Sequence, residues 1–245
     1  MVQRVRLRYA KRGRLRFTSH RDFARAFERA LRRAEVPMGY SAGFTPHPKI
    51  SYVGASPTGV ASEAEYLEIG LAKIVDPEQL RVALDAVLPD GLDIVEAVLA
   101  GPGSLAERMQ ASAWRIEFPG VPTAEVEAAL RAFLAREELG VERVTKSGRK
   151  TVDIRGPVVW AEVVPAAPGV AGRADDHPRA TMNVVVRQVT PAVRPDDIVA
   201  ALHAVAGLAP ARPPIAARVA QGPLDGQMRI GDPLATDREH AATSS

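Results

Sequence analysis

Two histidines near the N-terminus, His20 and His47, are the strongest candidates for chemistry in this sequence. An imidazole titrates near neutral pH and can act as a general acid or base, and a nearby lysine such as Lys49 can stabilise developing negative charge. His47 lies between two prolines in the segment YSAGFTPHPKISYV, residues 40–53. Because a proline fixes its own backbone and pushes the preceding residue towards an extended conformation, we expect this segment to present His47 on a stiff arm.

Two carboxylates, Glu63 and Glu65, could join these histidines. They occur in the alternating run EAEYLEIGL, and a strand places residues two apart on the same face. Two histidines and two carboxylates could bind a metal ion or a small molecule, but the four positions lack the close spacing typical of metal ligands. We therefore predict no metal site, and a solvated strand face remains the simpler interpretation of the glutamates.

The segment HRDFARAFERALRRA that follows Ser19 has the 3.6-residue period of an amphipathic helix, and Ser19 with Asp22 is typical of a helix N-cap. Apolar residues share one face, which we expect to be core: Phe23, Phe27, Ala30, Leu31 and Ala34. Arginines occupy the other face at one-turn spacing, which suits a phosphate backbone: Arg21, Arg25, Arg29, Arg32 and Arg33. Lys49 could add to this basic set, whereas a purely solvated helix face is the alternative.

The charge of the chain is unevenly distributed. Residues 1–50 contain 13 Lys and Arg against 3 Asp and Glu, whereas the remaining residues contain 19 against 26. A local positive field of this size favours an anionic partner such as RNA. All four tyrosines and four of the six phenylalanines also lie within residues 1–66, and any that are exposed could stack on bases.

The composition excludes several kinds of site. The 245 residues include no cysteine, so this chain has no thiolate nucleophile, disulfide or cysteine-held iron–sulfur cluster. The first residues alternate charged and apolar side chains, and no stretch approaches the length of a membrane span. We expect a soluble cytoplasmic protein.

An internal repeat indicates the fold. PEQLRVALDAV (77–87) and PDDIVAALHAV (195–205) align without a gap, and each lies between two strand-like runs. Further helices are expected at 19–34 and 123–135, and further strands around 3–9, 50–54, 113–118, 141–145 and 151–164. The order is β-α-β-β-α-β, twice, which predicts an α+β protein of two tandem ferredoxin-like units with antiparallel sheets.

We place the first unit at residues 1–105 and the second at 106–221. Residues 165–180, rich in Pro, Gly and Ala, are expected to form a loop, and residues 222–245 a disordered tail.

The N-terminal half resembles the bacterial radical SAM-linked protein family, a domain of unknown function encoded beside, or fused to, a radical SAM protein. The resemblance is carried by FTSHRDFARAFERALRRAEVP, YSAGFTPHPKIS and SPTGVASEAEYLEIGL. The positions that match its motifs are Ser19, His20, Asp22, Arg25, Arg32, Arg33, Tyr40, Ser41, Gly43, Phe44, Pro46, His47, Pro48, Ser51, Gly59, Glu63 and Glu65.

This resemblance implies a radical SAM protein as partner. S-adenosylmethionine and the iron–sulfur cluster are expected only on that partner, and no cofactor is expected on this chain, which lacks cysteine. We expect a non-catalytic protein that binds RNA, or presents a substrate, during RNA or ribosome modification; its oligomeric state is left open.

Two alternatives stay open. One is a metal-independent endoribonuclease with His20 or His47 as general base, and the other is an accessory protein that binds a metal or small molecule. Both need the two histidines close together. A helix over 19–34 is about 22 Å long, so the chain after it must run back along the helix to bring His47 level with His20.

Overall fold

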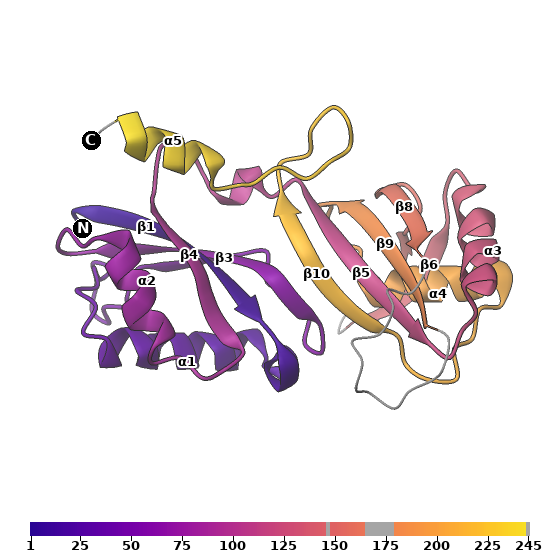
Figure 1. The fold of residues 1–245 in the computed structure, drawn as a ribbon, viewed down its shortest axis with the longest axis horizontal. Coiled ribbons are helices and arrows are strands. Elements are labelled where there is room, and N and C mark those ends of the chain that lie inside the picture. The colour runs from indigo at the N-terminus through magenta and orange to yellow at the C-terminus, as the bar shows by residue number, and fades with distance from the viewer. Residues whose placement is uncertain (146–147, 165–178, 244–245) are drawn as a thin grey trace. The chain divides into compact units, whose positions relative to one another are not determined.

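The structure is a computed structural model that describes residues 1–145, 148–164 and 179–243. It is a mixed α/β structure with mostly antiparallel strand pairing, and five α-helices occur within the described residues (Figure 1). The chain forms two compact units. Unit 1 comprises Met1–Met109, Ala220–Pro223 and the described residues from Gly231 onward, and unit 2 comprises Gln110–Val219 and Leu224–Ile230.

Along the chain of unit 1, helices alternate with strands, and the strands pair with other strands that lie far away in the sequence. Its sheet has the order β4-β1-β3, β2 pairs with β3, and these pairings are antiparallel. Its elements are β1 (Gln3–Lys11), the 3-10 helix η1 (Gly13–Phe17), α1 (His20–Arg33), β2 (Ile50–Val53), β3 (Ala61–Leu71), α2 (Pro77–Asp85), β4 (Leu92–Leu99), the 3-10 helix η2 (Ala106–Arg108) and α5 (Ala235–Thr243).

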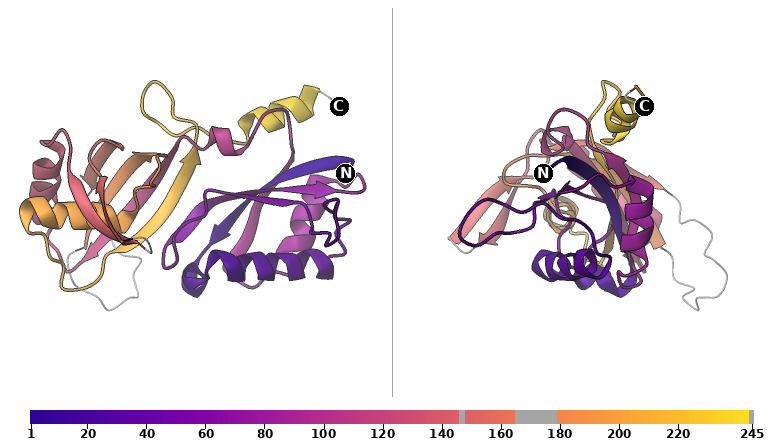
Figure 2. Two further views of the ribbon diagram at one scale, coloured as in Figure 1. Left: turned by 180° about the vertical axis from the view of Figure 1, so that it is seen from behind. Right: turned by 90° about the vertical axis from the view of Figure 1, so that its left-hand side faces the viewer.

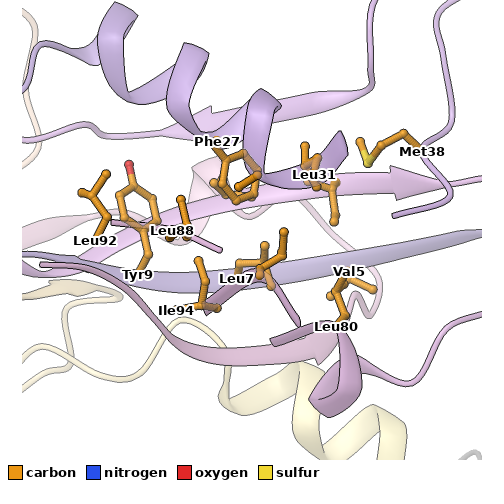
Figure 3. Packing of buried hydrophobic residues seen from close by; sticks show 14 of the residues in the cluster. Val5, Leu7, Tyr9, Phe27, Leu31, Met38, Leu80, Leu88, Leu92 and Ile94 are labelled. Atoms are coloured by element: carbon orange, nitrogen blue, oxygen red, sulfur yellow. The ribbon is translucent and has the colours of Figure 1, made fainter. Parts of the chain in front are cut away.

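The main core of unit 1 lies between its sheet and the helices α1 and α2. Phe27 and Leu31 extend from α1 towards Leu7 on β1, while Leu80 comes from α2 (Figure 3). The 3.6-residue period of α1 and the two-residue period of β1 put these apolar side chains on facing surfaces. The apolar stripe predicted for α1 is therefore confirmed, and its packing fixes which face of the helix remains outside.

A second apolar cluster covers the other side of this sheet. Ala64 and Tyr66 of β3 alternate with the core residues of the same strand and pack with Leu105, Met109 and Leu234. In Figures 1 and 2, α1 and α5 lie on opposite sides of the sheet of unit 1.

The prediction of a disordered tail over residues 222–245 is wrong for the described part, 222–243. Leu234 and Asp237 are fully buried, and residues 235–243 form α5. Only a few side chains of residues 222–243 pack against the sheet, so the sequence shows little apolar periodicity there. A segment of this kind is hard to tell from a disordered tail by its sequence.

Unit 2 repeats the strand–helix pattern with an added hairpin. Its sheet has the order β10-β5-β9-β8, and β6 pairs only with β7 among the described strands. Its elements are β5 (Ala111–Pro119), α3 (Thr123–Leu134), β6 (Gly140–Thr145), β7 (Gly148–Asp153), β8 (Val158–Val164), β9 (Arg179–Arg187), α4 (Pro195–Ala206) and β10 (Ile215–Gly222), whose last residues belong to unit 1. The loop expected over 165–180 lies largely outside the described residues.

The two helices of the internal repeat begin where the sequence predicts. α2 starts at Pro77 and α4 at Pro195, positions where a missing backbone donor costs little. Asp76 caps α2 by accepting the backbone N–H of Gln79 at 2.8 Å. Among the helices of the described residues, none has the length and apolar character that a membrane crossing requires.

Candidate nucleic-acid interface

The N-terminus of α1 is capped as predicted. The Ser19 hydroxyl accepts the backbone N–H of Asp22 at 3.2 Å and donates to the Asp22 carboxylate at 2.6 Å. An N-cap of this kind stabilises a helix by about 1 kcal/mol. The observed bonds make Ser19 and Asp22 structural residues that set where α1 begins.

The outer face of α1 carries five exposed arginines. Within the described residues, none of them forms an ion pair, and only Asp22 and Glu28 supply negative charge on this helix. We call this set the arginine face; its members are Arg21, Arg25, Arg29, Arg32 and Arg33. The predicted exposure of these side chains is confirmed, and their role in binding stays a prediction.

Other arginines of unit 1 have acidic partners. Arg12 donates to Glu63 at 2.7 Å and to Asp93 at 2.6 Å, and hydrogen bonding to Glu63 raises the pKa of Arg12. Arg81 on α2 pairs with Glu78 one turn earlier. The arginine face of α1 thus differs from these paired arginines of the same unit.

Glu63 and Glu65 have different environments although they are two residues apart. The Glu63 side chain is about half exposed and is paired with Arg12. Glu65 is buried, lies opposite Tyr9 in the sheet, and accepts the backbone N–H of Ser56 at 2.9 Å. No group of three or more His, Asp or Glu residues that could hold a metal ion occurs in the described part of the chain. The constellation of His20, His47, Glu63 and Glu65 is therefore not assembled, and the interpretation of Glu65 as part of a solvated strand face is wrong.

His20 lies at the first position of α1, with its ring edge-on to Tyr52 of β2 at a centroid distance of 4.9 Å. Tyr52 also contacts Phe23, which stacks on Tyr9 of β1 at 4.3 Å. Burial raises the pKa of Tyr52, and the negative charge of Glu28 adds to the shift. His20 is thus an exposed residue at the edge of an aromatic cluster that anchors the start of α1.

The segment after α1 forms a closed hairpin, which we call the GFTPHP hairpin (residues 39–49). Tyr40 bridges Pro48, and the backbone N–H of Ser41 donates to the His47 carbonyl at 2.9 Å. The backbone N–H of His47 donates in turn to the Ser41 hydroxyl at 3.0 Å. The prediction of a stiff segment around His47 therefore has a hydrogen-bonded basis, with Ser41 as the residue that closes the loop.

The tip of this hairpin is exposed to solvent. Gly43 has a φ of 139°, which other residues rarely adopt, and Phe44, Pro46 and His47 are exposed. Lys49 and Ser51 follow at the start of β2 and are also exposed. The motif residues of this hairpin therefore lie on the surface and leave the core to α1 and the strands.

The two histidines belong to opposite ends of α1. Tyr40 and Pro48 of the hairpin line a small pocket together with Glu28 and Arg32, in the second half of α1. Glu28 and Arg32 are about 12 and 18 Å along the helix axis from His20. The chain after α1 does not carry His47 back to His20, so an acid–base pair or a metal site that needs both histidines has no support in this geometry.

Several surface groups beside the arginine face were missed from the sequence. Arg16 and Phe17 lie in η1 just before the Ser19 cap, and the Arg16 guanidinium lies 4.7 Å from the centre of the Phe17 ring. The Phe17 side chain is 60% exposed. The signal was present as alternating basic and apolar residues in RGRLRF, but this pattern equally fits a short strand.

Comparisons with known proteins identify a bacterial group. A family model described as an uncharacterized protein conserved in bacteria matches residues 4–195. The matched range includes α1, the GFTPHP hairpin and β3. The search of curated proteins found no match.

Proposed function

The chain belongs to the DUF2344 family, a group of proteins conserved in bacteria, and we propose that it is a cytoplasmic RNA-binding partner of a radical SAM enzyme. In this role the chain holds an RNA, or a ribosomal component, while the partner carries out its modification. The chain itself supplies binding and orientation, and no reaction is assigned to its residues.

One observation carries the RNA part of this proposal: the arginine face has no acidic partners within the described residues. An arginine that already pairs with a carboxylate must break that pair before it binds a phosphate. Such a pair need not be broken at Arg21, Arg25 or Arg29. These three arginines recur every four residues, about 6 Å apart along the helix axis. A row of like charges on one ridge is complementary to the phosphates of a single strand.

The radical SAM part rests on the motif resemblance around Ser19, His20 and the GFTPHP hairpin. Since this chain has no cysteine, the iron–sulfur cluster and S-adenosylmethionine belong to the partner in this proposal. Co-purification from native cells tests it. A radical SAM protein recovered with the chain supports the partnership, and its consistent absence under conditions that retain other complexes counts against it.

We further infer that each unit is ferredoxin-like. In unit 1 the strand order β4-β1-β3, with β2 beside β3, supports this inference, as does the order β10-β5-β9-β8 in unit 2. In unit 1 this arrangement leaves the outer surface of α1 uncovered, where it can meet a long ligand.

RNA affinity measured against salt concentration tests the proposal. A variant with Arg25, Arg29 and Arg32 changed to Glu should bind much more weakly, and the slope of log affinity against log salt should fall by about 0.7 for each phosphate that the variant no longer neutralises. The matched control changes three exposed arginines of unit 2, Arg115, Arg131 and Arg136, to Glu. An equally large drop in affinity in both variants, or a native protein whose binding ignores salt, overturns the proposal.

A further inference from the structure

Three aromatic side chains near α1 are exposed to solvent. Phe17 is 60% exposed, Tyr40 is 55% exposed and Phe44 is fully exposed. Large apolar side chains are costly to leave in water, whereas the other aromatic residues of unit 1 pack in or beside the core. These three rings are therefore free of the core and available to contact a ligand.

The position of Phe44 is set by its backbone. The GFTPHP hairpin closes through the paired hydrogen bonds of Ser41 and His47, and the Lys49 N–H donates to the Gly39 carbonyl at 2.9 Å. Gly43, with its φ of 139°, turns the chain just before Phe44. Because the hairpin is closed by these bonds, its backbone loses little conformational freedom when the Phe44 ring binds.

The aromatic side chains lie at both ends of α1. Phe17 precedes the Ser19 cap by two residues, and Arg16 already stacks on its ring. At the other end, Tyr40 lines a pocket with Arg32. Between these ends, α1 extends about 21 Å, which is the length of about six stacked nucleotides.

We propose that the arginine face, together with Phe17, Tyr40 and Phe44, binds single-stranded RNA. The guanidinium groups hold the phosphates, and the exposed rings stack on unpaired bases. This inference rests on the proposed function, because it requires that the chain binds RNA, and it adds that the RNA is single-stranded.

The rings distinguish a single strand from a duplex. In a duplex each base is already stacked between its neighbours, so an exposed side chain cannot reach its flat surface, whereas every unpaired base offers one. A protein partner would have to place acidic side chains opposite all five arginines, whereas any RNA strand offers one phosphate per nucleotide.

Fluorescence anisotropy with labelled oligouridine of about 12 nucleotides tests this inference, with a perfect RNA duplex of equal length as the comparison. Phe17→Ala with Phe44→Ala should weaken binding to the single strand roughly tenfold or more, while duplex binding changes little. Phe44→Trp should retain affinity, since tryptophan also stacks. The matched control is Trp160→Ala on β8 of unit 2, whose ring is 43% exposed.

The outcomes separate this inference from the proposed function. If the aromatic variants bind like the native protein, or the duplex binds as tightly as the single strand, the single-strand inference is wrong even when the arginine variant binds more weakly. If no RNA binds in a salt-dependent way, both proposals are wrong. Circular dichroism of each variant shows whether the fold is intact. If Phe44→Trp binds like the native protein while the alanine variant binds weakly, the drop in affinity comes from the missing ring.

Discussion

The guanidinium of Arg6 and the carboxylate of Asp237 form an ion pair at 2.6 Å in which both side chains are completely buried. The pair joins β1 to α5 across 231 positions of the chain. Arg108 donates to the same carboxylate at 2.8 Å, and the backbone N–H of Gly101 donates at 2.9 Å. Asp237 therefore pairs with two arginines and attaches the C-terminal helix to the strands of unit 1.

Replacing Asp237 with alanine should destabilise unit 1 strongly. The substitution removes the fully buried carboxylate that Arg6 and Arg108 share, and Arg6 keeps its second carboxylate partner, Glu68. Breaking a buried pair typically costs about 3–5 kcal/mol, and because Glu68 remains we expect the lower end of this range. Urea unfolding monitored by circular dichroism measures the destabilisation. Glu239→Ala, which removes an exposed acid from the same helix, should change the free energy of unfolding by less than about 0.5 kcal/mol. Equal effects of the two substitutions would show that the buried pair contributes nothing special.

The stability contributed by Asp237 should depend on pH. Burial alone would raise the pKa of Asp237, but the hydrogen bonds from Arg6, Arg108 and Gly101 outweigh burial and hold it below its ordinary value. A lowered pKa in the folded state means that the contribution is complete above the unfolded pKa of about 3.9, and is lost as pH falls through the folded value.

Comparison with Asp237→Asn, which cannot titrate, isolates this effect. The difference in the free energy of unfolding between the native protein and this variant should be constant from about pH 7 to 5 and should shrink below about pH 4. A difference that stays constant down to the lowest pH at which the protein folds would contradict the assignment.

Local features of unit 1 could be predicted from the sequence, because they depend on residues a few positions apart. The Ser19 and Asp76 caps and the apolar stripe of α1 follow from spacings of three and four residues. The exposure of the arginine face follows from the same period.

Features set by distant partners could not be predicted. The buried state of Glu65 depends on its position opposite Tyr9 and on a bond from Ser56, whereas Glu63 meets Arg12, which directly follows β1. Periodicity assigned both glutamates one environment, because it contains no information about depth along the sheet. The ordered state of α5 likewise depends on Arg6, which no local pattern connects to Asp237.

The relation between His20 and His47 shows the same limit. The proline pair indicated a stiff segment, and the hairpin bonds account for that stiffness. The direction of the segment, however, is set by its pairing to the end of β3, where the Gly70 N–H donates to the Lys49 carbonyl at 2.9 Å. This contact holds the hairpin near the second half of α1 and away from His20.

Replacing Tyr52 with phenylalanine should leave stability unchanged or increase it. The Tyr52 hydroxyl is buried and has no hydrogen-bond partner among the described residues, and burying such a group costs about 1–3 kcal/mol. The substitution removes the hydroxyl and keeps the ring that contacts His20 and Phe23. Tyr40→Phe, at an exposed ring, is the control for removal of a hydroxyl in water. A destabilisation of more than about 1 kcal/mol on Tyr52→Phe would mean that the hydroxyl has a partner in solution.

The turn that precedes β4 depends on a glycine. Gly91 has a φ of 90°, and its carbonyl accepts the backbone N–H of Arg12 at 2.8 Å, which holds the turn against the end of β1. A Cβ added at Gly91 would lie 3.0 Å from the Arg12 carbonyl oxygen, a backbone atom that cannot move without disturbing this bond. We expect Gly91→Ala to destabilise the protein by about 1–2 kcal/mol, because a side chain is strained at this φ and also crowds the oxygen. Gly226→Ala is the matched control, since its Cβ meets open space and its φ is not positive. Thermal unfolding of the two variants measures the difference in stability. A Gly91→Ala protein as stable as the Gly226→Ala protein would show that the turn can relax.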